Sequence, residues 1–232
     1  MRRRIAAVVI AAIVLTGPFF AMAAAAATAP PGPVPEDPTD PIRAGEYWLD
    51  QYGIRDAWNT TRGAGVKIAI IDTGIGKTPP AFAGVVAGTD VSGVGGADGR
   101  SPIGGVDANH GSWVASLAAA RATPDGRGVV GVAPEAELLA ISVGFGQTTD
   151  KPFTEQIAEA VRWAVDNGAD VINMSLTTNT PDWPESWDQA FQYAYDKDVV
   201  IVVAAGNRGS GTTRVGADRK STRLNSSHMS IS

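Results

Sequence analysis

Cysteine is absent from the 232 residues. Its absence excludes a disulfide framework, a thiolate metal site and a cysteine nucleophile. Positive charge is also scarce, because the net charge is -5 at pH 7 and no long basic run occurs between residues 42 and 218. The electrostatic footprint of a nucleic-acid-binding protein is therefore missing, and we expect no nucleic-acid partner.

Long hydrophobic runs are missing too, since none reaches the ~20 residues that a membrane-spanning helix needs. The run at residues 5–15 follows Arg2, Arg3 and Arg4, ends before Gly17-Pro18, and precedes a stretch of alanines. This order is typical of a secretory signal peptide, and Gly17-Pro18 disfavours the alternative of a membrane anchor. We predict a signal peptide at residues 1–27 and a secreted or cell-envelope protein. No stable membrane span is expected after cleavage.

Composition divides the remaining chain into three parts. Residues 28–41 hold six prolines and little that is apolar, which favours an extended spacer. Residues 42–218 are long enough for one domain with its own core. Residues 219–232 contain five serines, no acidic residue and no strand or helix periodicity. We interpret this last segment as a non-native tail joined to a broken gene.

Within the domain, apolar runs alternate with amphipathic segments. The runs predict strands at residues 66–71, 137–143, 170–174 and 199–204, and the segments predict helices at 109–121, 154–167 and 185–197. Asp182 and Glu185 have the spacing of a capping box at the start of the last helix. Strand and helix in repetition predict an α/β fold of three αβα layers around a mainly parallel sheet, incomplete at the C-terminus.

Polar residues follow the predicted strands. Asp72 ends the first, Ser175 follows the third, and Asn207 follows the fourth. Open parallel sheets bind ligands beyond the carboxyl ends of their strands, so these side chains are expected on one rim. His110 starts a predicted helix that could lean over the same rim. It is the one histidine outside the tail, and so the one candidate for a general base near neutral pH.

Each of these residues also has an ordinary structural interpretation. Asp72 before Thr-Gly suits a turn, His110 before Gly suits a helix cap, and Asn207 after Gly suits a turn. Ser175 could cap the segment that follows it. Only their convergence on one rim favours a site.

Two familiar motifs do not fit their context. Asp72-Thr-Gly is the triplet of aspartic peptidases, but these need a second such carboxylate, and the sequence has no other Asp-Thr-Gly or Asp-Ser-Gly. Gly126-Arg-Gly128-Val-Val-Gly131 matches a dinucleotide-binding pattern, yet it leads into Pro134 and a predicted strand when it should open a helix. We reject both interpretations.

Five segments together resemble the subtilisin-like serine peptidases, or subtilases. They are Gly63 to Gly74 around Asp72, His110-Gly-Ser-Trp-Val-Ala, Gly128 to Pro134, Val171 to Leu176, and Ala204-Ala-Gly-Asn207. The order Asp then His agrees with the family order Asp, His, Ser. The resemblance implies that Asp72 orients His110, that His110 is the general base, and that the Asn207 amide donates to the oxyanion.

The same resemblance implies a bacterial protein and a protein or peptide substrate in extended conformation. Ser175, Leu176 and Thr177 match an edge that pairs with the peptide, although Thr177 stands where the family has Gly. Ala204, Ala205 and Gly206 would line the pocket for the side chain before the cleaved bond. No cofactor is implied. A structural calcium ion is common in the family, but Ala81 lies where a ligand is often found, so we assign no metal ligand.

The nucleophile is missing from the resemblance. The family serine lies in Gly-Thr-Ser-x-Ala, and no Gly-Thr-Ser occurs in this sequence. Two hypotheses follow. The chain is the N-terminal part of a secreted serine endopeptidase with an Asp-His-Ser triad, inactive without its serine segment; or it is a secreted, non-catalytic relative that binds extended peptides. The retained Asp72, His110 and Asn207 favour the first.

Overall fold

A five-stranded parallel sheet forms the centre of the protein. The computed structural model describes residues 32–105, 107–176 and 184–204. The strands lie in the order β2-β3-β1-β4-β5, and every pair is parallel. Their bounds are β1 Lys67–Asp72, β2 Val85–Asp90, β3 Glu137–Ser142, β4 Val171–Met174 and β5 Val200–Val203.

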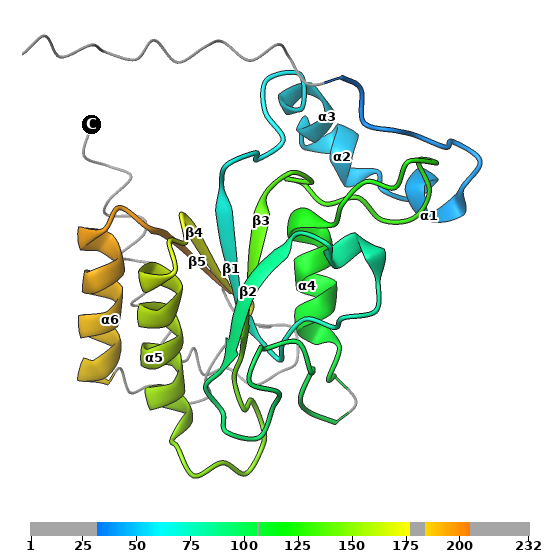
Figure 1. Ribbon diagram of the computed structural model, residues 1–232. Helices are drawn as coiled ribbons and strands as arrows, with labels where there is room; N and C mark the ends of the chain where they lie inside the picture. Colours follow the sequence, from blue (N-terminus) through cyan, green and yellow to red (C-terminus); the bar gives the residue numbers. More distant parts are fainter. Residues whose placement is uncertain (1–31, 106, 177–183, 205–232) are drawn as a thin grey trace, which may run out of the picture.

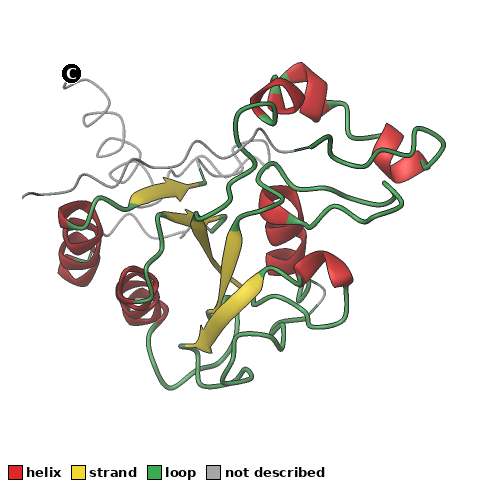
Figure 2. Cartoon of the chain, turned by 45° about the horizontal axis from the view of Figure 1, so that its top comes forward, coloured by secondary structure: helices red, strands yellow, loops and turns green. Residues whose placement is uncertain are grey.

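Helices cover both faces of the sheet (Figures 1 and 2). Helices α5 (Phe153–Asp166) and α6 (Glu185–Asp196) lie side by side on one face, and α4 (His110–Ala119) lies on the other. Each of the predicted strands and helices is present with ends shifted by at most two residues. The predicted α/β fold with a parallel sheet between two helical layers is therefore confirmed.

Strand β2 was not predicted from the sequence. Its residues, Val-Val-Ala-Gly-Thr-Asp, form an edge strand with little full burial, so no long apolar run marks it. Gly88 interrupts it for a steric reason: a Cβ there would lie 2.1 Å from the Asp98 carbonyl oxygen. The loop that crosses this strand requires glycine, and the glycine weakens the strand pattern.

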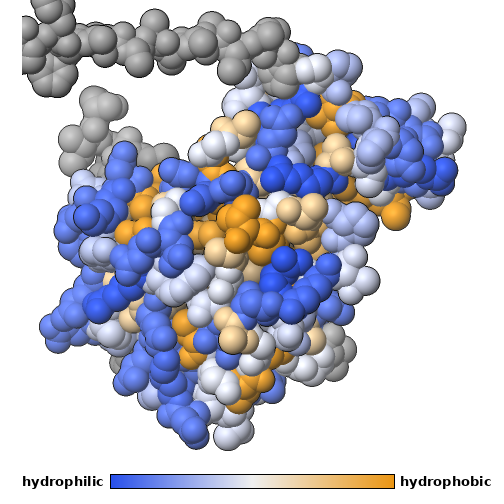
Figure 3. Space-filling view, viewed as in Figure 1, coloured by the Kyte–Doolittle hydropathy of each residue, from blue (hydrophilic) through white to orange (hydrophobic). Residues whose placement is uncertain are grey.

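The face covered by α5 and α6 holds the larger core. Ile157, Val161 and Ala164 of α5 are buried against Leu139, Ile141 and Ile172 of the sheet. The helices expose their polar sides, which appear blue on the left of Figure 3. This is the amphipathic division that the helical spacing predicts.

The predicted capping box of α6 is wrong. Helix α6 begins at Glu185, with Pro184 in the N-cap position and no side-chain cap. Glu185 is therefore the first helical residue, whereas a capping box needs it at the third position. Pro184 explains the difference, because its fixed φ suits the start of a helix and it has no N–H to satisfy. Asp182 lies outside the described residues.

Small residues allow α4 to lie close to the sheet. Ala115 and Ala119 are fully buried against Ile70, Leu138 and Ala140. On the same side, several large apolar side chains remain half exposed in the described ranges: Trp113 and Leu117 of α4, and Val200 and Val202 of β5. Figure 3 shows hydrophobic residues near the middle of the viewed surface, below the N-terminal helices.

An N-terminal segment with three one-turn helices packs at one end of the domain (Figure 1). These are α1 Pro41–Ala44, α2 Trp48–Gln51 and α3 Ile54–Ala57, joined to the described end of the proline-rich segment. Leu49 and Trp58 are buried with Val130, and Val34 packs against them. The described residues of the expected spacer, 32–41, thus contact the domain, although residues 28–31 lie outside the structure's described part.

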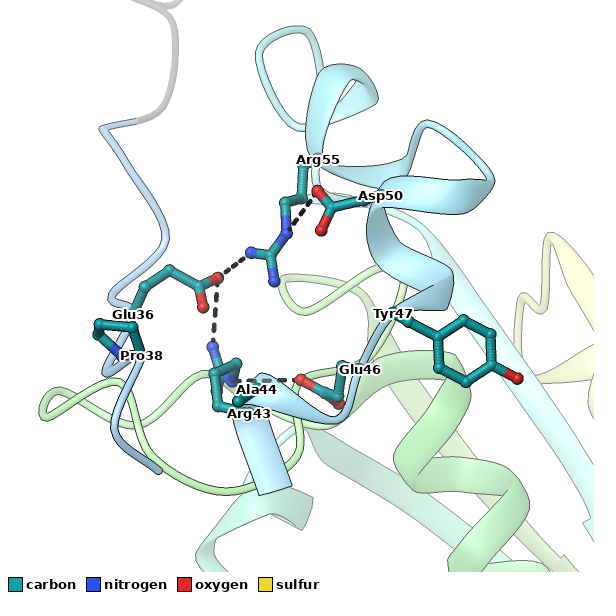
Figure 4. Close-up of a pocket in the computed structure, with 8 residues that line it drawn as sticks. All are labelled: Glu36, Pro38, Arg43, Ala44, Glu46, Tyr47, Asp50 and Arg55. Atoms are coloured by element: carbon teal, nitrogen blue, oxygen red, sulfur yellow. Dashed lines mark hydrogen bonds and ion pairs between the residues drawn. The ribbon is translucent and has the colours of Figure 1, made fainter. Parts of the chain in front are cut away.

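Arg43 connects this segment to the domain. Its side chain is buried, and it donates to the carbonyl oxygens of Gly128 at 2.9 Å and Pro35 at 3.0 Å. Glu46 pairs with it at 3.2 Å (Figure 4) and accepts from the Val130 N–H at 3.0 Å. Burial raises the pKa of Glu46, although the Val130 N–H and Arg43 act in the opposite direction. A polar segment is buried here because the loop at 126–130 supplies its hydrogen-bond partners.

Across residues 32–105, 107–176 and 184–204, no helix combines the length and the apolar character needed to span a bilayer. The predicted signal peptide at residues 1–27 lies outside these ranges and remains a prediction.

Candidate active site

Asp72 is the last residue of β1, at the carboxyl end of the sheet. The strand is central and lies between β3 and β4, so the Asp72 side chain is completely buried. One carboxylate oxygen, Oδ1, accepts the N–H of Thr73 at 2.7 Å. A buried carboxylate needs such donors, because burial otherwise disfavours its charge.

His110 is the first residue of α4, and it meets Asp72 across the edge of the sheet. Its Nδ1 lies 2.9 Å from both carboxylate oxygens. The imidazole is 40 % exposed while the carboxylate is 0 % exposed. An ionised carboxylate can only accept, so the Nδ1 atom carries the proton and Nε2 is left as a basic nitrogen. The pair thus combines a buried carboxylate with an imidazole that is partly exposed to solvent.

The turn after Asp72 fits tightly under the start of α4. Gly74 has φ of +99°, a conformation that favours glycine. A Cβ on Gly111 would lie 2.4 Å from the Gly74 carbonyl oxygen and 3.0 Å from the Asp72 Cβ. Glycine at both positions therefore allows the backbone contact that brings His110 to Asp72.

Three side chains that the sequence did not single out hold this turn. The Thr73 hydroxyl contacts the start of α4, and the Ser112 hydroxyl accepts the Gly76 N–H at 3.0 Å. Arg100 donates to the carbonyl oxygens of Ile75 at 2.9 Å and Gly76 at 2.7 Å. Their partners are distant backbone atoms, which leave no pattern in the sequence. Thr73 and Ser112 lay within the motifs Asp72-Thr-Gly and His110-Gly-Ser-Trp-Val-Ala, but the motifs gave neither of them a role.

Asp90, at the end of β2, organises the loop beside the site. Its carboxylate accepts hydrogen bonds from the hydroxyls of Ser142 and Ser92, each at 2.6 Å, and from the N–H groups of Gly93 and Gly95. Burial alone would raise the pKa of Asp90, but these hydrogen bonds hold it below the usual value. The ionised form therefore stabilises the folded protein.

We expect acid to remove this stabilisation. A carboxyl whose pKa is lower in the folded state stabilises the fold at a pH above its unfolded-state pKa of about 3.8. This stabilisation disappears as the pH falls through the lowered folded-state pKa. Urea unfolding of wild type and Asp90→Asn between pH 3 and pH 7 measures the contribution of the Asp90 carboxylate to the free energy of unfolding. The wild type should be more stable at pH 7, and its advantage should shrink below pH 4. A difference that does not depend on pH would contradict this expectation.

The predicted substrate residues lie partly within the described ranges. Ser175 and Leu176 follow β4, and the Asn173 amide donates to the Ser175 hydroxyl at 3.0 Å. The Ala204 N–H donates to the Met174 carbonyl at 3.1 Å, so the ends of β4 and β5 are adjacent. Four predicted residues lie outside the described ranges: Thr177, Ala205, Gly206 and Asn207.

In the part of the chain that the structure describes, no three or more His, Asp or Glu side chains gather where they could hold an ion. The expectation that the protein needs no cofactor remains a prediction.

Comparisons with known proteins identify the family. The sequence profile of the subtilase family matches residues 63–230, and this chain belongs to that family. The matched range includes most of residues 219–232, whose foreign origin remains a prediction. The resemblance noted from the sequence motifs is thereby confirmed.

Individual relatives agree with this result. A thermophilic serine proteinase of Bacillus sp. (strain AK1) is 36 % identical over 76 % of this chain and 42 % of its own length. Thermitase of Thermoactinomyces vulgaris is 36 % identical over 75 % of this chain and 59 % of its own length. The chain therefore spans about half the length of these relatives.

The fold comparison leads to the same family. The crystal structure of fervidolysin from Fervidobacterium pennivorans, described as a keratinolytic enzyme related to subtilisin, superposes with a TM-score of 0.64 at 29 % identity. The match covers 79 % of this chain and 28 % of that protein.

Proposed function

We propose that this chain carries the acid and the base of a serine endopeptidase that is exported from the cell and hydrolyses peptide bonds. The observation that carries the proposal is the contact between His110 and Asp72. The Nδ1 atom of His110 lies 2.9 Å from both oxygens of the fully buried Asp72 carboxylate, while the imidazole remains partly exposed to solvent. A base oriented in this way is what a hydroxyl nucleophile needs for activation.

In this proposal, His110 takes the proton of a serine hydroxyl through Nε2 as that hydroxyl attacks the peptide carbonyl. Asp72 keeps the proton on Nδ1 and stabilises the imidazolium that forms. His110 then returns the proton to the leaving amine. The Asn207 side chain would donate to the oxyanion, an assignment that rests on the motif Ala204-Ala-Gly-Asn207. In subtilisin, loss of such a donor costs about 3 kcal/mol.

The proposed substrate is an extended peptide. Ser175, Leu176 and Thr177 would pair with its backbone, and Ala204, Ala205 and Gly206 would line the pocket next to the cleaved bond. The hydrogen bond between Ala204 N–H and Met174 O supports this assignment, because it sets the two segments beside each other at the rim. Export is proposed from the signal-like composition of residues 1–27.

The nucleophile is proposed to lie on a segment outside these 232 residues, because the sequence contains no Gly-Thr-Ser. The gene, read in frame beyond the codon for Ala217, is expected to encode Gly-Thr-Ser-x-Ala. We call the protein that includes this segment the longer product. A natural stop codon directly after Ser232 would contradict this part of the proposal.

A fluorophosphonate probe tests the proposal, because it reacts with an activated serine. The 232-residue chain is expected to remain unlabelled, and the longer product is expected to be labelled and to hydrolyse casein. Replacing the serine of Gly-Thr-Ser-x-Ala by alanine in the longer product is the matched control and should abolish both. Labelling of the 232-residue chain, or a longer product that neither reacts nor hydrolyses, would overturn the proposal.

A further inference from the structure

Helix α4 begins without a cap of its own. The first N–H groups of a helix have no partner within the helix, and a side chain of the N-cap residue usually accepts from one of them. Asn109 occupies the N-cap position of α4 but makes no such hydrogen bond. The N–H of Gly111, the second helical residue, donates instead to the Thr73 hydroxyl at 2.9 Å. The cap thus comes from the turn that follows β1.

The same hydroxyl makes a second hydrogen bond to the approach of α4. Thr73 Oγ1 donates to the carbonyl oxygen of Ala108 at 2.8 Å. A hydroxyl has one proton to donate, so Thr73 uses it on one side of His110 and accepts on the other. Residues 108 and 111 flank His110 in the chain. The two bonds therefore fix the backbone on both sides of the base.

Thr73 is itself held firmly in relation to Asp72. Its N–H donates to Asp72 Oδ1 at 2.7 Å, and its carbonyl oxygen accepts from the Ile103 N–H at 2.8 Å. Its side chain is buried, so water has little access to replace the two hydroxyl bonds. One residue thus contacts the acid through its backbone and the base's helix through its side chain.

We propose that Thr73 is a positioning residue that caps α4 from the neighbouring turn and so holds His110 Nδ1 on the Asp72 carboxylate. The inference rests on the proposed function, because it gives His110 and Asp72 the roles of base and acid. It adds a residue that reaches no reacting atom. Its effect passes through the position of α4, and the hydroxyl, which serine shares with threonine, is the group that matters.

The His110 Nδ1–H proton reports this position directly and needs no nucleophile. In the ¹⁵N-histidine-labelled 232-residue chain, this proton should give a downfield resonance that exchanges slowly with water. Asp72→Ala should remove the resonance and so assign it, whereas His228→Gln should leave it unchanged. In Thr73→Val, which replaces the hydroxyl with a methyl group, exchange is expected to become about tenfold faster. Thr73→Ser should keep exchange close to wild type.

Thr123→Val is the matched control. The Thr123 hydroxyl also donates to one backbone carbonyl and accepts one backbone N–H, both of Arg127, but it lies in a loop that does not touch the site. This variant should leave the His110 resonance unchanged. If Thr73→Val does not fold, Thr73→Ala removes the hydroxyl without inserting a methyl group beside two polar atoms. A folded Thr73→Val or Thr73→Ala with unchanged exchange, or a folded Thr73→Ser without the resonance, would overturn the inference.

Kinetics of the longer product separate this inference from the proposed function. Thr73→Val is expected to lower kcat about 10- to 100-fold with little change in KM, and Thr73→Ser should restore most of the rate. A wild-type longer product that shows no hydrolysis would overturn the proposed function while the resonance data still support the positioning role. Full activity in folded Thr73→Val would overturn the positioning role alone.

Discussion

Replacement of His110 by alanine in the longer product is expected to lower kcat by about 10⁶-fold, which is the loss that removal of the histidine causes in subtilisin. Without the imidazole, no group remains to take the serine proton. Asp72→Asn is expected to lower kcat by about 10⁴-fold, since an amide can donate to Nδ1 and stabilise the wrong tautomer. Hydrolysis of a chromogenic peptide by matched amounts of folded protein measures both losses.

Asp125→Asn is a control of the same residue type for Asp72→Asn, because it changes an exposed carboxylate in a loop that does not contact Asp72 or His110. It should keep kcat near the wild-type value. The assignment of acid and base would be wrong if His110→Ala or Asp72→Asn retained more than about one hundredth of the wild-type rate, because the losses expected for this machinery are much larger.

Gly111→Ala is expected to destabilise the protein by about 3 kcal/mol or more, because the added Cβ would overlap backbone atoms that cannot rotate away. The carbonyl oxygen of Gly74 lies 2.4 Å from the position of this Cβ. The expected sign is opposite to helix propensity, since alanine is favoured over glycine by up to about 1 kcal/mol inside a helix. Urea unfolding at pH 7 gives the change in the free energy of unfolding.

Gly105→Ala is the corresponding control, because no atom lies within 4 Å of a Cβ at that position. It should change the free energy of unfolding by less than about 1 kcal/mol. In the Gly111→Ala variant, the His110 Nδ1–H resonance should also shift or disappear, because α4 must move away from Asp72 to relieve the overlap. Wild-type stability in Gly111→Ala would contradict the close contact between α4 and the Gly74 turn.

The central fold was largely predictable from the sequence, for a physical reason. Strands β1 and β3 are buried over most of their length, so they appear as continuous apolar runs, and α5 and α6 show the spacing of one buried face. Strand β5 is also a continuous apolar run, although Val200 and Val202 remain half exposed. Strand β2 lies at the edge and contains Gly88, so it lacks such a run. Asp182, predicted as a cap, was assigned from local spacing that Pro184 overrides.

The proline-rich segment shows what composition cannot predict. Its few apolar residues predicted an extended spacer, yet Val34 packs against the third hydrophobic cluster and Asp40 caps α1 through the Arg43 N–H at 2.9 Å. Burial of Arg43 depends in part on the Gly128 carbonyl group, 85 residues away in the chain. Such partners come together only on folding, so no local sequence pattern predicts them.

The sequence by itself determined the chemistry available to this protein: one histidine outside the tail, an aspartate at the end of an apolar strand, and the motifs that place the chain among the subtilases. Only the tertiary structure decided the geometry. Thr73 forms hydrogen bonds with Ala108 and Gly111, and Gly111 packs closely against Gly74. Both contacts arise because the parallel sheet brings the end of β1 under the start of α4. Contacts between residues 35 to 38 positions apart depend on that packing, and they give Asp72 and His110 their 2.9 Å contact.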